Sequence, residues 1–268
     1  MIKFIFNKFL SLFFGIEIIN STFKNKILTQ LNQYKLIKEY NINFLLEKYN
    51  FDNQKIKKLK SNSNSSNLQD LFVLSQLNFK KNGYFVEFGV IDGIVGSNTL
   101  LLEKEYGWDG IVVEPSREFE KVKKNRKCIK DNRCIYNKSG QFISFTETDE
   151  KGLSTISAFK SSDYHYKSRK KNYLEYKVET ITLNLLLEEN ASPSIIDYLS
   201  IDTEGSEFLI LSAFNFDKYS FKIISVEHNY QNQRTKLYDL LTKNGYKRVF
   251  EGISDIEDWY INPKYLKN

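Results

Sequence analysis

Two acidic residues that end neighbouring apolar segments carry the clearest chemical signal in this chain of 268 residues. Glu87 is followed by a turn that contains Gly89 and Gly93, and glycine lets a ligand approach the backbone closely. Asp92 lies in the same turn, so the turn is acidic. Carboxylates repel phosphate groups and attract cations, which favours a ligand with a positive group. A dinucleotide fingerprint GxGxxG would need a glycine where Ile91 stands, which disfavours NAD.

Glu114 is the second of these acidic residues. It follows the apolar segment 110–113 and lies 27 residues after Glu87. A carboxylate at the end of a second strand can accept two hydrogen bonds from a ribose diol. The two acids together predict a ligand that has a ribose, a positive group and no phosphate chain at the glycines.

Strands and helices alternate after residue 68, which predicts parallel βαβ units in an α/β fold. The short connection between the last two strands predicts an antiparallel edge, as in a seven-stranded nucleotide-binding sheet. Ligands of such sheets bind at the carboxyl ends of the strands. The polar stretch 147–177 is predicted to be a long solvated loop above this edge, or alternatively a lid or an acceptor pocket. The expected strands are 84–88, 110–113, 134–136, 196–201, 223–227, 246–250 and 259–261, and the expected helices are 68–79, 97–106, 117–130, 207–214 and 236–243.

The order of the motifs resembles the FkbM family of S-adenosylmethionine-dependent methyltransferases over roughly residues 68–262. The resemblance implies a Rossmann-like, seven-stranded class I methyltransferase sheet, S-adenosylmethionine as cofactor, and O-methylation, often of sugar or natural-product hydroxyls. It is carried by the motifs VEFGVIDG (86–93), GSNTLLLEKEYGWDGIVVEP (96–115), IDYLSIDTEGSE (196–207), IISVEHN (223–229) and DWY (258–260).

The resemblance also implies which residues bind the cofactor. Glu114 would hold the ribose. Asn98 and Thr99, in the first turn of the next helix, would reach the cofactor or cap that helix. The methionine part would be lined by Glu87, Gly89, Asp92 and Gly93.

Methyl transfer to a hydroxyl needs a group that takes up a proton, and two mechanisms fit the later strand ends. In the first, His228 is the general base and an acid such as Asp202 or Glu227 orients its ring. In the second, Asp202, Glu227 and His228 hold a divalent ion such as Mg²⁺, which lowers the pKa of the hydroxyl. The metal-free base is the favoured interpretation.

The N-terminal part has a different composition from the rest of the chain. Residues 1–60 contain 11 of the 39 basic residues and 4 of the 33 acidic ones, so the remainder is nearly neutral and nucleic acid is not an expected partner. We expect a mostly helical extension at 1–60, a Ser/Asn linker at 61–67 and the methyltransferase domain at 68–268. The apolar residues 2–19 are predicted to pack on the protein or a second subunit, or alternatively to touch the inner face of a membrane.

Cysteine usage favours the cytoplasm, because Cys128 and Cys134 lack the CxxC spacing of a zinc or redox motif. The expected acceptor is a carbohydrate, such as a surface-glycan precursor or a nucleotide sugar, or a related metabolite. Two other functions compete with this interpretation: a NAD-dependent oxidoreductase on a Rossmann-like fold, and a module that retains the fold without catalysis. The oligomeric state stays open.

Overall fold

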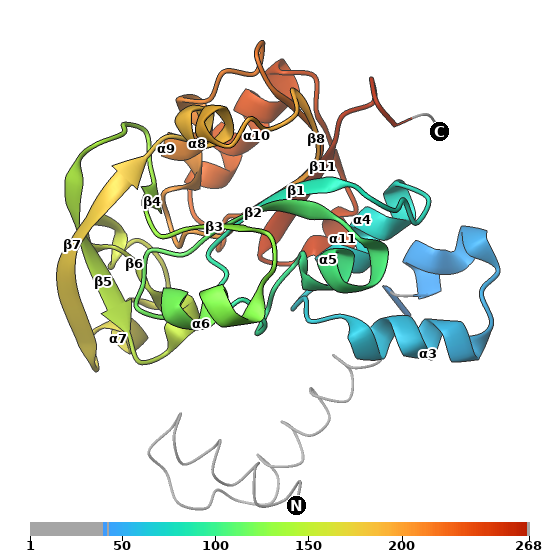
Figure 1. The fold of residues 1–268 in the computed structure, drawn as a ribbon, viewed down its shortest axis with the longest axis horizontal. Helices are drawn as coiled ribbons and strands as arrows, with labels where there is room; N and C mark the ends of the chain where they lie inside the picture. Colours follow the sequence, from blue (N-terminus) through green and yellow to red (C-terminus); the bar gives the residue numbers. More distant parts are fainter. Residues whose placement is uncertain (1–39, 42, 267–268) are drawn as a thin grey trace, which may run out of the picture.

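A computed structural model describes residues 40–41 and 43–266, and it contains the predicted seven-stranded sheet (Figure 1). The strand order is β10-β11-β9-β8-β1-β2-β3. β1, β2, β3, β8 and β9 pair in parallel, while β11 is antiparallel to both β9 and β10. The α/β class and the antiparallel edge are therefore confirmed. The strands are β1 Tyr84–Phe88, β2 Asp109–Val113, β3 Ile129–Asp131, β8 Ile195–Ile201, β9 Ser220–Glu227, β10 Lys247–Val249 and β11 Glu257–Ile261.

Helices cover both faces of this sheet (Figure 1). One face packs against α8 Leu183–Glu189, α9 Glu207–Ser212 and α10 Gln233–Lys243. The other packs against α4 Gln69–Gln76, α5 Leu100–Tyr106, α6 Phe119–Asn125 and α11 Glu251–Ser254. The strands are apolar on both sides because both faces are buried.

Alternation along β1 decides where Glu87 points. Val86 and Phe88 belong to the core below α8, α9 and α10, whereas Phe85 belongs to the opposite core. Since side chains alternate between faces, Glu87 lies on the same face as Phe85, towards α5 and α6.

A second, four-stranded sheet is inserted between β3 and β8, in the order β4-β7-β5-β6. Its strands are β4 Cys134–Ile135, β5 Phe142–Thr148, β6 Thr155–Ile156 and β7 Tyr173–Ile181. Three predictions were wrong here. The strand expected at 134–136 belongs to this second sheet. The third strand of the main sheet is β3, whose first two residues fall within the expected helix 117–130. The expected long loop 147–177 contains paired strands, the 3-10 turns η2 Lys151–Leu153 and η3 Ser157–Phe159, and the short helix α7 Tyr166–Arg169.

The segment before the main sheet packs against it. Leu45, Leu46 and Leu59 join the core on the α4 face, the last of them from α3 Asn53–Asn62, which follows the short turn η1 Glu47–Tyr49. Within the expected linker 61–67, Ser65 is buried and forms a β-bridge with Gly96. The expected contacts of residues 2–19 lie outside the described residues. Among the residues that the structure describes, no helix has the length and apolar character needed to cross a bilayer.

Candidate active site

A cavity lies where β1, β2 and β8 end, and the inserted sheet forms its other wall. Its polar lining includes Glu114, Asp202 and Glu204, which all follow strands of the main sheet. The remaining wall is largely apolar. The other lining residues are Phe88, Gly89, Ile91, Val113, Pro115, Cys134, Ile135, Phe145, Lys151, Gly152, Ser154, Ile156, Thr203 and Ser206.

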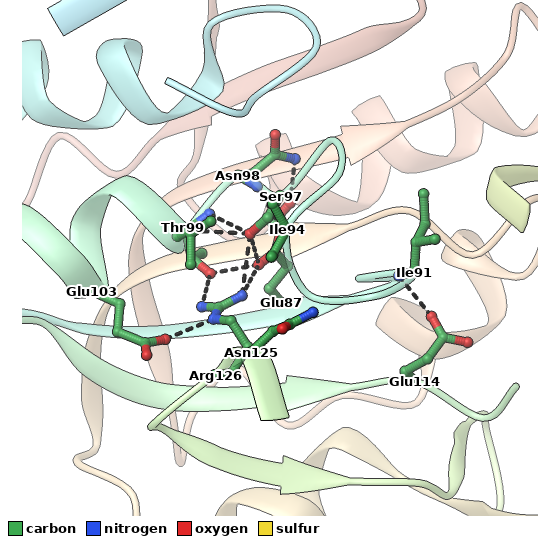
Figure 2. Close-up of polar contacts among 12 residues, drawn as sticks. Glu87, Ile91, Ile94, Ser97, Asn98, Thr99, Glu103, Glu114, Asn125 and Arg126 are labelled. Carbon is green, nitrogen blue, oxygen red and sulfur yellow. Dashed lines mark hydrogen bonds and ion pairs between the residues drawn. The ribbon is translucent and has the colours of Figure 1, made fainter. Parts of the chain in front are cut away.

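The turn after β1 brings these strand ends together. Gly89 has φ +74°, and a Cβ atom there would lie 2.0 Å from the backbone oxygen of Asp202, so only glycine fits. Ile91 also has a left-handed backbone, with φ 54°, and its N–H donates to Glu114 Oε2 at 2.9 Å. The turn therefore lies against the end of β8 through Gly89. It contacts the end of β2 through Ile91, and Figure 2 shows the bond from Ile91 to Glu114.

Glu114 is buried and held at both carboxylate oxygens. Oε2 accepts from the Ile91 N–H, and Oε1 accepts from the Ser116 N–H at 2.9 Å. Desolvation raises the pKa of Glu114 to about 7, against the lowering effect of these hydrogen bonds. Each oxygen has a second lone pair, so the carboxylate can still accept from a ligand in the cavity.

Glu87, by contrast, is directed away from the cavity. Its Oε2 accepts from the hydroxyl groups of Ser97 and Thr99, and its Oε1 accepts from the Asn98 N–H. Arg126 Nη1 lies 3.4 Å from Oε2 (Figure 2). Glu87 does not belong to the described cavity lining, so the expected pair of acids facing one ligand reduces to Glu114 on this side.

Arg126, at the end of α6, is the centre of this buried cluster. Its guanidinium is completely buried and pairs with Glu103 at 2.7 Å as well as with Glu87. It also lies over the ring of Phe85, 5.5 Å from the centroid. The guanidinium of Arg126 therefore neutralises part of the charge of two buried carboxylates, those of Glu87 and Glu103.

Asp92 and Gly93 shape the turn from within. Asp92 Oδ1 accepts from the N–H groups of Ile94 and Val95, both at 2.9 Å. Gly93 has φ +83°, and a Cβ atom there would lie 2.9 Å from Cγ of Arg126. Both residues thus have structural roles in the loop, and neither belongs to the described cavity lining.

Asn98 and Thr99 are buried, and their side chains are engaged by the protein. Asn98 Oδ1 accepts from the Ser65 hydroxyl at 2.9 Å, and its Nδ2 donates to Ser200 Oγ at 2.9 Å. Thr99 Oγ1 accepts from Arg126 Nη2 at 2.7 Å. Of the two roles predicted for these residues, the geometry favours support of the loop and helix start.

Three carboxyl groups gather at the ends of β8 and β9. Asp202, Glu204 and Glu227 each offer an oxygen atom, and these atoms lie within 4.8 Å of one another. Desolvation raises the pKa of Asp202 to about 7. It also raises the pKa values of Glu204 and Glu227 well above their ordinary value, and repulsion by Asp202 adds to both shifts. The carboxyl groups of Asp202 and Glu227 lie close together, and each affects the pKa of the other. The protonated form of these carboxyl groups is therefore favoured when no cation is bound.

Glu204 connects the cluster to the inserted segment. It has a left-handed backbone, with φ 59°, and its carboxylate pairs with the buried Arg169 of α7. Arg169 also forms a bidentate ion pair with Asp163, at 2.7 and 2.9 Å. Asn229 Nδ2 donates to Glu204 Oε2 at 3.2 Å. Residues from the insertion and from the end of β9 thus fix Glu204 beside Asp202.

His228 follows Glu227 in the chain but is not one of the three residues of the carboxylate cluster. Its Nδ1 accepts from the Tyr230 N–H at 3.0 Å, which places the proton of the neutral ring on Nε2. Nε2 lies 3.7 Å from Asp258 Oδ1, and Asp258 also pairs with Arg234 at 2.8 Å. Burial lowers the pKa of His228. The structure brings Asp202 and Glu227 together, as predicted, but directs His228 towards Asp258.

Three functional candidates were missed by sequence reasoning: Glu204, Arg126 and Arg169. Glu204 carries a signal in the sequence, because it precedes Gly205 directly after a strand. The two arginines carry no such signal, because their carboxylate partners are separated from them in sequence. The partners of Arg126 lie 23 and 39 residues away. Those of Arg169 lie 6 and 35 residues away. Each arginine lies in a stretch rich in basic residues that is typical of a solvated surface.

Comparison with known proteins assigns this arrangement to a family. The family model described as "Methyltransferase FkbM domain" matches residues 87–248, more than half of the chain. The chain belongs to the FkbM methyltransferase family. The match begins at Glu87 and includes Glu114 and the whole carboxylate cluster. Membership supports S-adenosylmethionine-dependent methyl transfer as the class of reaction and S-adenosylmethionine as the cofactor, and it favours this class over a nicotinamide-dependent oxidoreductase.

Solved structures similar to this chain include further methyltransferases. The FkbM methyltransferase of Methylobacillus flagellatus KT is 10% identical, with 78% of this chain and 59% of that chain covered and a TM-score of 0.40. The precorrin-6y C5,15-methyltransferase of Geobacter metallireducens GS-15 is 11% identical, with coverage of 72% and 86% and a TM-score of 0.37. A search of curated proteins finds no significant match.

Proposed function

We propose that this protein transfers the methyl group of S-adenosylmethionine to a hydroxyl group of a carbohydrate, such as a surface-glycan precursor or a nucleotide sugar. One observation carries the proposal: Glu114 and Asp202 line the same cavity from the ends of β2 and β8, the strands on either side of β1. Support for a carbohydrate comes from the family resemblance and from the tyrosine-rich insertion beside the cavity.

The cavity residues suit the parts of this cofactor. Apolar side chains such as Val113, Ile135 and Phe145 can contact an adenine ring. The free lone pairs of Glu114 can accept from the two ribose hydroxyls. Asp202 adds a carboxylate to the cavity lining, and its negative charge suits a positively charged sulfur. S-adenosylmethionine, when bound, supplies a methyl group that the sulfonium activates for attack by an oxygen nucleophile.

The protein must orient the acceptor hydroxyl and remove its proton. Asp202 fits this role because its carboxyl lines the cavity and its pKa of about 7 suits proton transfer near neutral pH. As the O–CH₃ bond forms and the S–CH₃ bond breaks, the hydroxyl proton passes to Asp202. The loss of the sulfonium charge is matched by the loss of the carboxylate charge. His228, the base favoured by the sequence, would act by holding the loop that follows β9.

A divalent cation is the second candidate for activation of the hydroxyl. Asp202, Glu204 and Glu227 offer the oxygen ligands that Mg²⁺ prefers, and Oε2 of Glu227 is buried without a hydrogen-bond partner among the described residues. The ligand set expected from the sequence changes, since Glu204 replaces His228. In this alternative the carboxylates would bind the ion, and Asp202 would no longer take up the proton.

The test is to incubate the full chain with S-adenosylmethionine labelled in the methyl group and with glycan precursors of the host, with and without EDTA. We expect labelled O-methyl sugar, unchanged by EDTA, and a loss of 10²- to 10⁴-fold in rate for Asp202→Asn. Asp239→Asn is the matched control at an exposed acid of α10, outside the cluster. No transfer to any glycan would refute the carbohydrate proposal. Loss of activity in EDTA and recovery with Mg²⁺ would replace the base mechanism by the metal mechanism.

A further inference from the structure

We infer that Tyr164 and Tyr230 form the acceptor subsite, in which their rings stack on the apolar face of a sugar ring and hold its hydroxyl at Asp202. The inference rests on the proposed function and adds the residues that select the acceptor. Both tyrosines are well exposed, at 57% and 61%, although each lies next to residues that fix the carboxylate cluster.

Tyr230 is held at the end of β9 in a restricted conformation. Asn229 and Tyr230 both have left-handed backbones, with φ 43° and 54°. Such angles are uncommon for residues other than glycine and occur often at functional sites. The N–H groups of His228 and Asn229 both donate to the Ile256 oxygen, and His228 Nδ1 accepts from the Tyr230 N–H. The loop therefore presents an exposed aromatic ring from a rigid backbone.

The ring of Tyr230 is fixed as well. Its hydroxyl donates to Asp255 Oδ1 at 2.6 Å, and its ring meets that of His228 edge to face, with 5.4 Å between centroids. Asn229, the preceding residue, donates to Glu204. Tyr230 thus lies three residues after Glu227 in the chain, and its neighbour Asn229 contacts Glu204, a second member of the carboxylate cluster.

Tyr164 approaches the same cluster from the inserted segment. Its ring packs on His165, with 4.0 Å between centroids. The preceding residue, Asp163, binds Arg169, which pairs with Glu204. Burial raises the pKa of Tyr164, and the charges of Glu227 and Glu204 raise it further, as expected for a hydroxyl near those carboxylates.

The chemistry of such a site suits a sugar ring. An exposed aromatic ring in a fixed position offers an apolar surface at a small cost in conformational entropy. A pyranose has an apolar C–H face and hydroxyl groups around its edge. The face can stack on the tyrosines while a hydroxyl at the edge reaches the acidic cavity.

Two other exposed tyrosines of the insertion provide matched controls. Tyr166 has the ammonium groups of Lys167 and Lys170 over its ring, at 5.8 and 5.6 Å from the centroid. Tyr173 has that of Lys160 at 5.4 Å. Both rings thus already face lysine side chains.

The experiment measures methyl transfer to the glycan fraction that the wild-type protein methylates, together with the affinity for S-adenosylmethionine. We expect Tyr164→Ala and Tyr230→Ala each to raise KM for the acceptor about tenfold without changing cofactor affinity. Tyr164→Phe and Tyr230→Phe should retain a low KM because they keep the ring, and Tyr166→Ala and Tyr173→Ala should match the wild type. An unchanged KM in both alanine variants, or an equal rise in the controls, would overturn the subsite and leave the proposed function intact.

A binding measurement tests the subsite separately from turnover. Saturation-transfer NMR with methyl α-D-glucopyranoside and methyl α-D-mannopyranoside as probes, in the presence of S-adenosylhomocysteine, should show ring-proton signals for the wild-type protein. The Tyr164→Ala/Tyr230→Ala double variant should lose them. Absence of signal with the wild type, or equal signal with the double variant, would contradict the subsite whatever the assay of transfer shows.

Discussion

Replacement of Glu114 by glutamine tests the proposed contact with the cofactor ribose. The substitution keeps the size of the side chain and removes its charge. Both carboxylate oxygens accept from backbone N–H groups, of Ile91 and Ser116. Glutamine must therefore place its NH₂ group against one of these donors, and it offers the ribose only one good acceptor.

The expected loss follows from these hydrogen bonds. A hydrogen bond to a charged group contributes about 1.5–3 kcal/mol, so loss of the charged acceptor should weaken cofactor binding by about 10- to 150-fold. S-adenosylhomocysteine has the same ribose and lacks the sulfonium charge. The affinities for S-adenosylmethionine and S-adenosylhomocysteine should therefore fall by the same factor.

Isothermal titration calorimetry of both ligands at pH 6 and pH 8 measures the effect. The pKa of Glu114 is about 7, so wild-type affinity for S-adenosylhomocysteine should rise as the carboxylate ionises through that pH. Glu114→Gln should lose this rise, and Glu120→Gln, at an exposed acid of α6, should behave as the wild type. Unchanged affinity in Glu114→Gln would remove Glu114 from the cofactor site.

Three further predictions concern catalysis, loop support and stability. Initial rates of methyl transfer at saturating substrates should rise with pH through about 7, because Asp202 must lose its proton to act as a base; a rate that is flat from pH 6 to 8 would contradict that role. Arg126→Met leaves buried carboxylates unpaired, so urea unfolding should show a loss of about 3–5 kcal/mol, and Glu87→Gln/Arg126→Met should recover part of it. If the double variant is no more stable than the single one, the pair does not interact as described. The raised pKa of Glu114 means that the folded state favours the protonated carboxyl. Its protonation therefore contributes about 3 kcal/mol to the free energy of unfolding below pH 4.5, and this contribution is lost as the pH rises through about 7. Unfolding of the unliganded wild type should therefore need less urea at pH 8 than at pH 5.5, with a smaller difference in Glu114→Gln.

The main sheet could be predicted from the sequence because its strands are buried on both faces and form continuous apolar runs. β1 was predicted at 84–88, as observed, and β8 differs by one residue. β3 was missed because a three-residue strand with Lys130 at its centre has no such run. β5 and β7 were missed because they alternate polar and apolar residues in a region of mixed composition.

The site was predicted in part for a similar reason. Glu114 and Asp202 directly follow apolar strands, so the topology alone places them at one edge. The orientation of Glu87 depends on Arg126, which is distant in sequence and offers no local signal. The direction of His228 depends on Asp258 in β11, which becomes its neighbour only through the antiparallel pairing of β9 and β11.

The most direct test is a crystal structure of the full chain with S-adenosylhomocysteine. Both ribose hydroxyls should lie within hydrogen-bonding distance of the Glu114 carboxylate, with the sulfur atom facing Asp202 and the adenine against Val113 and Ile135. A nucleoside bound elsewhere, or one whose ribose does not contact Glu114, would contradict the account.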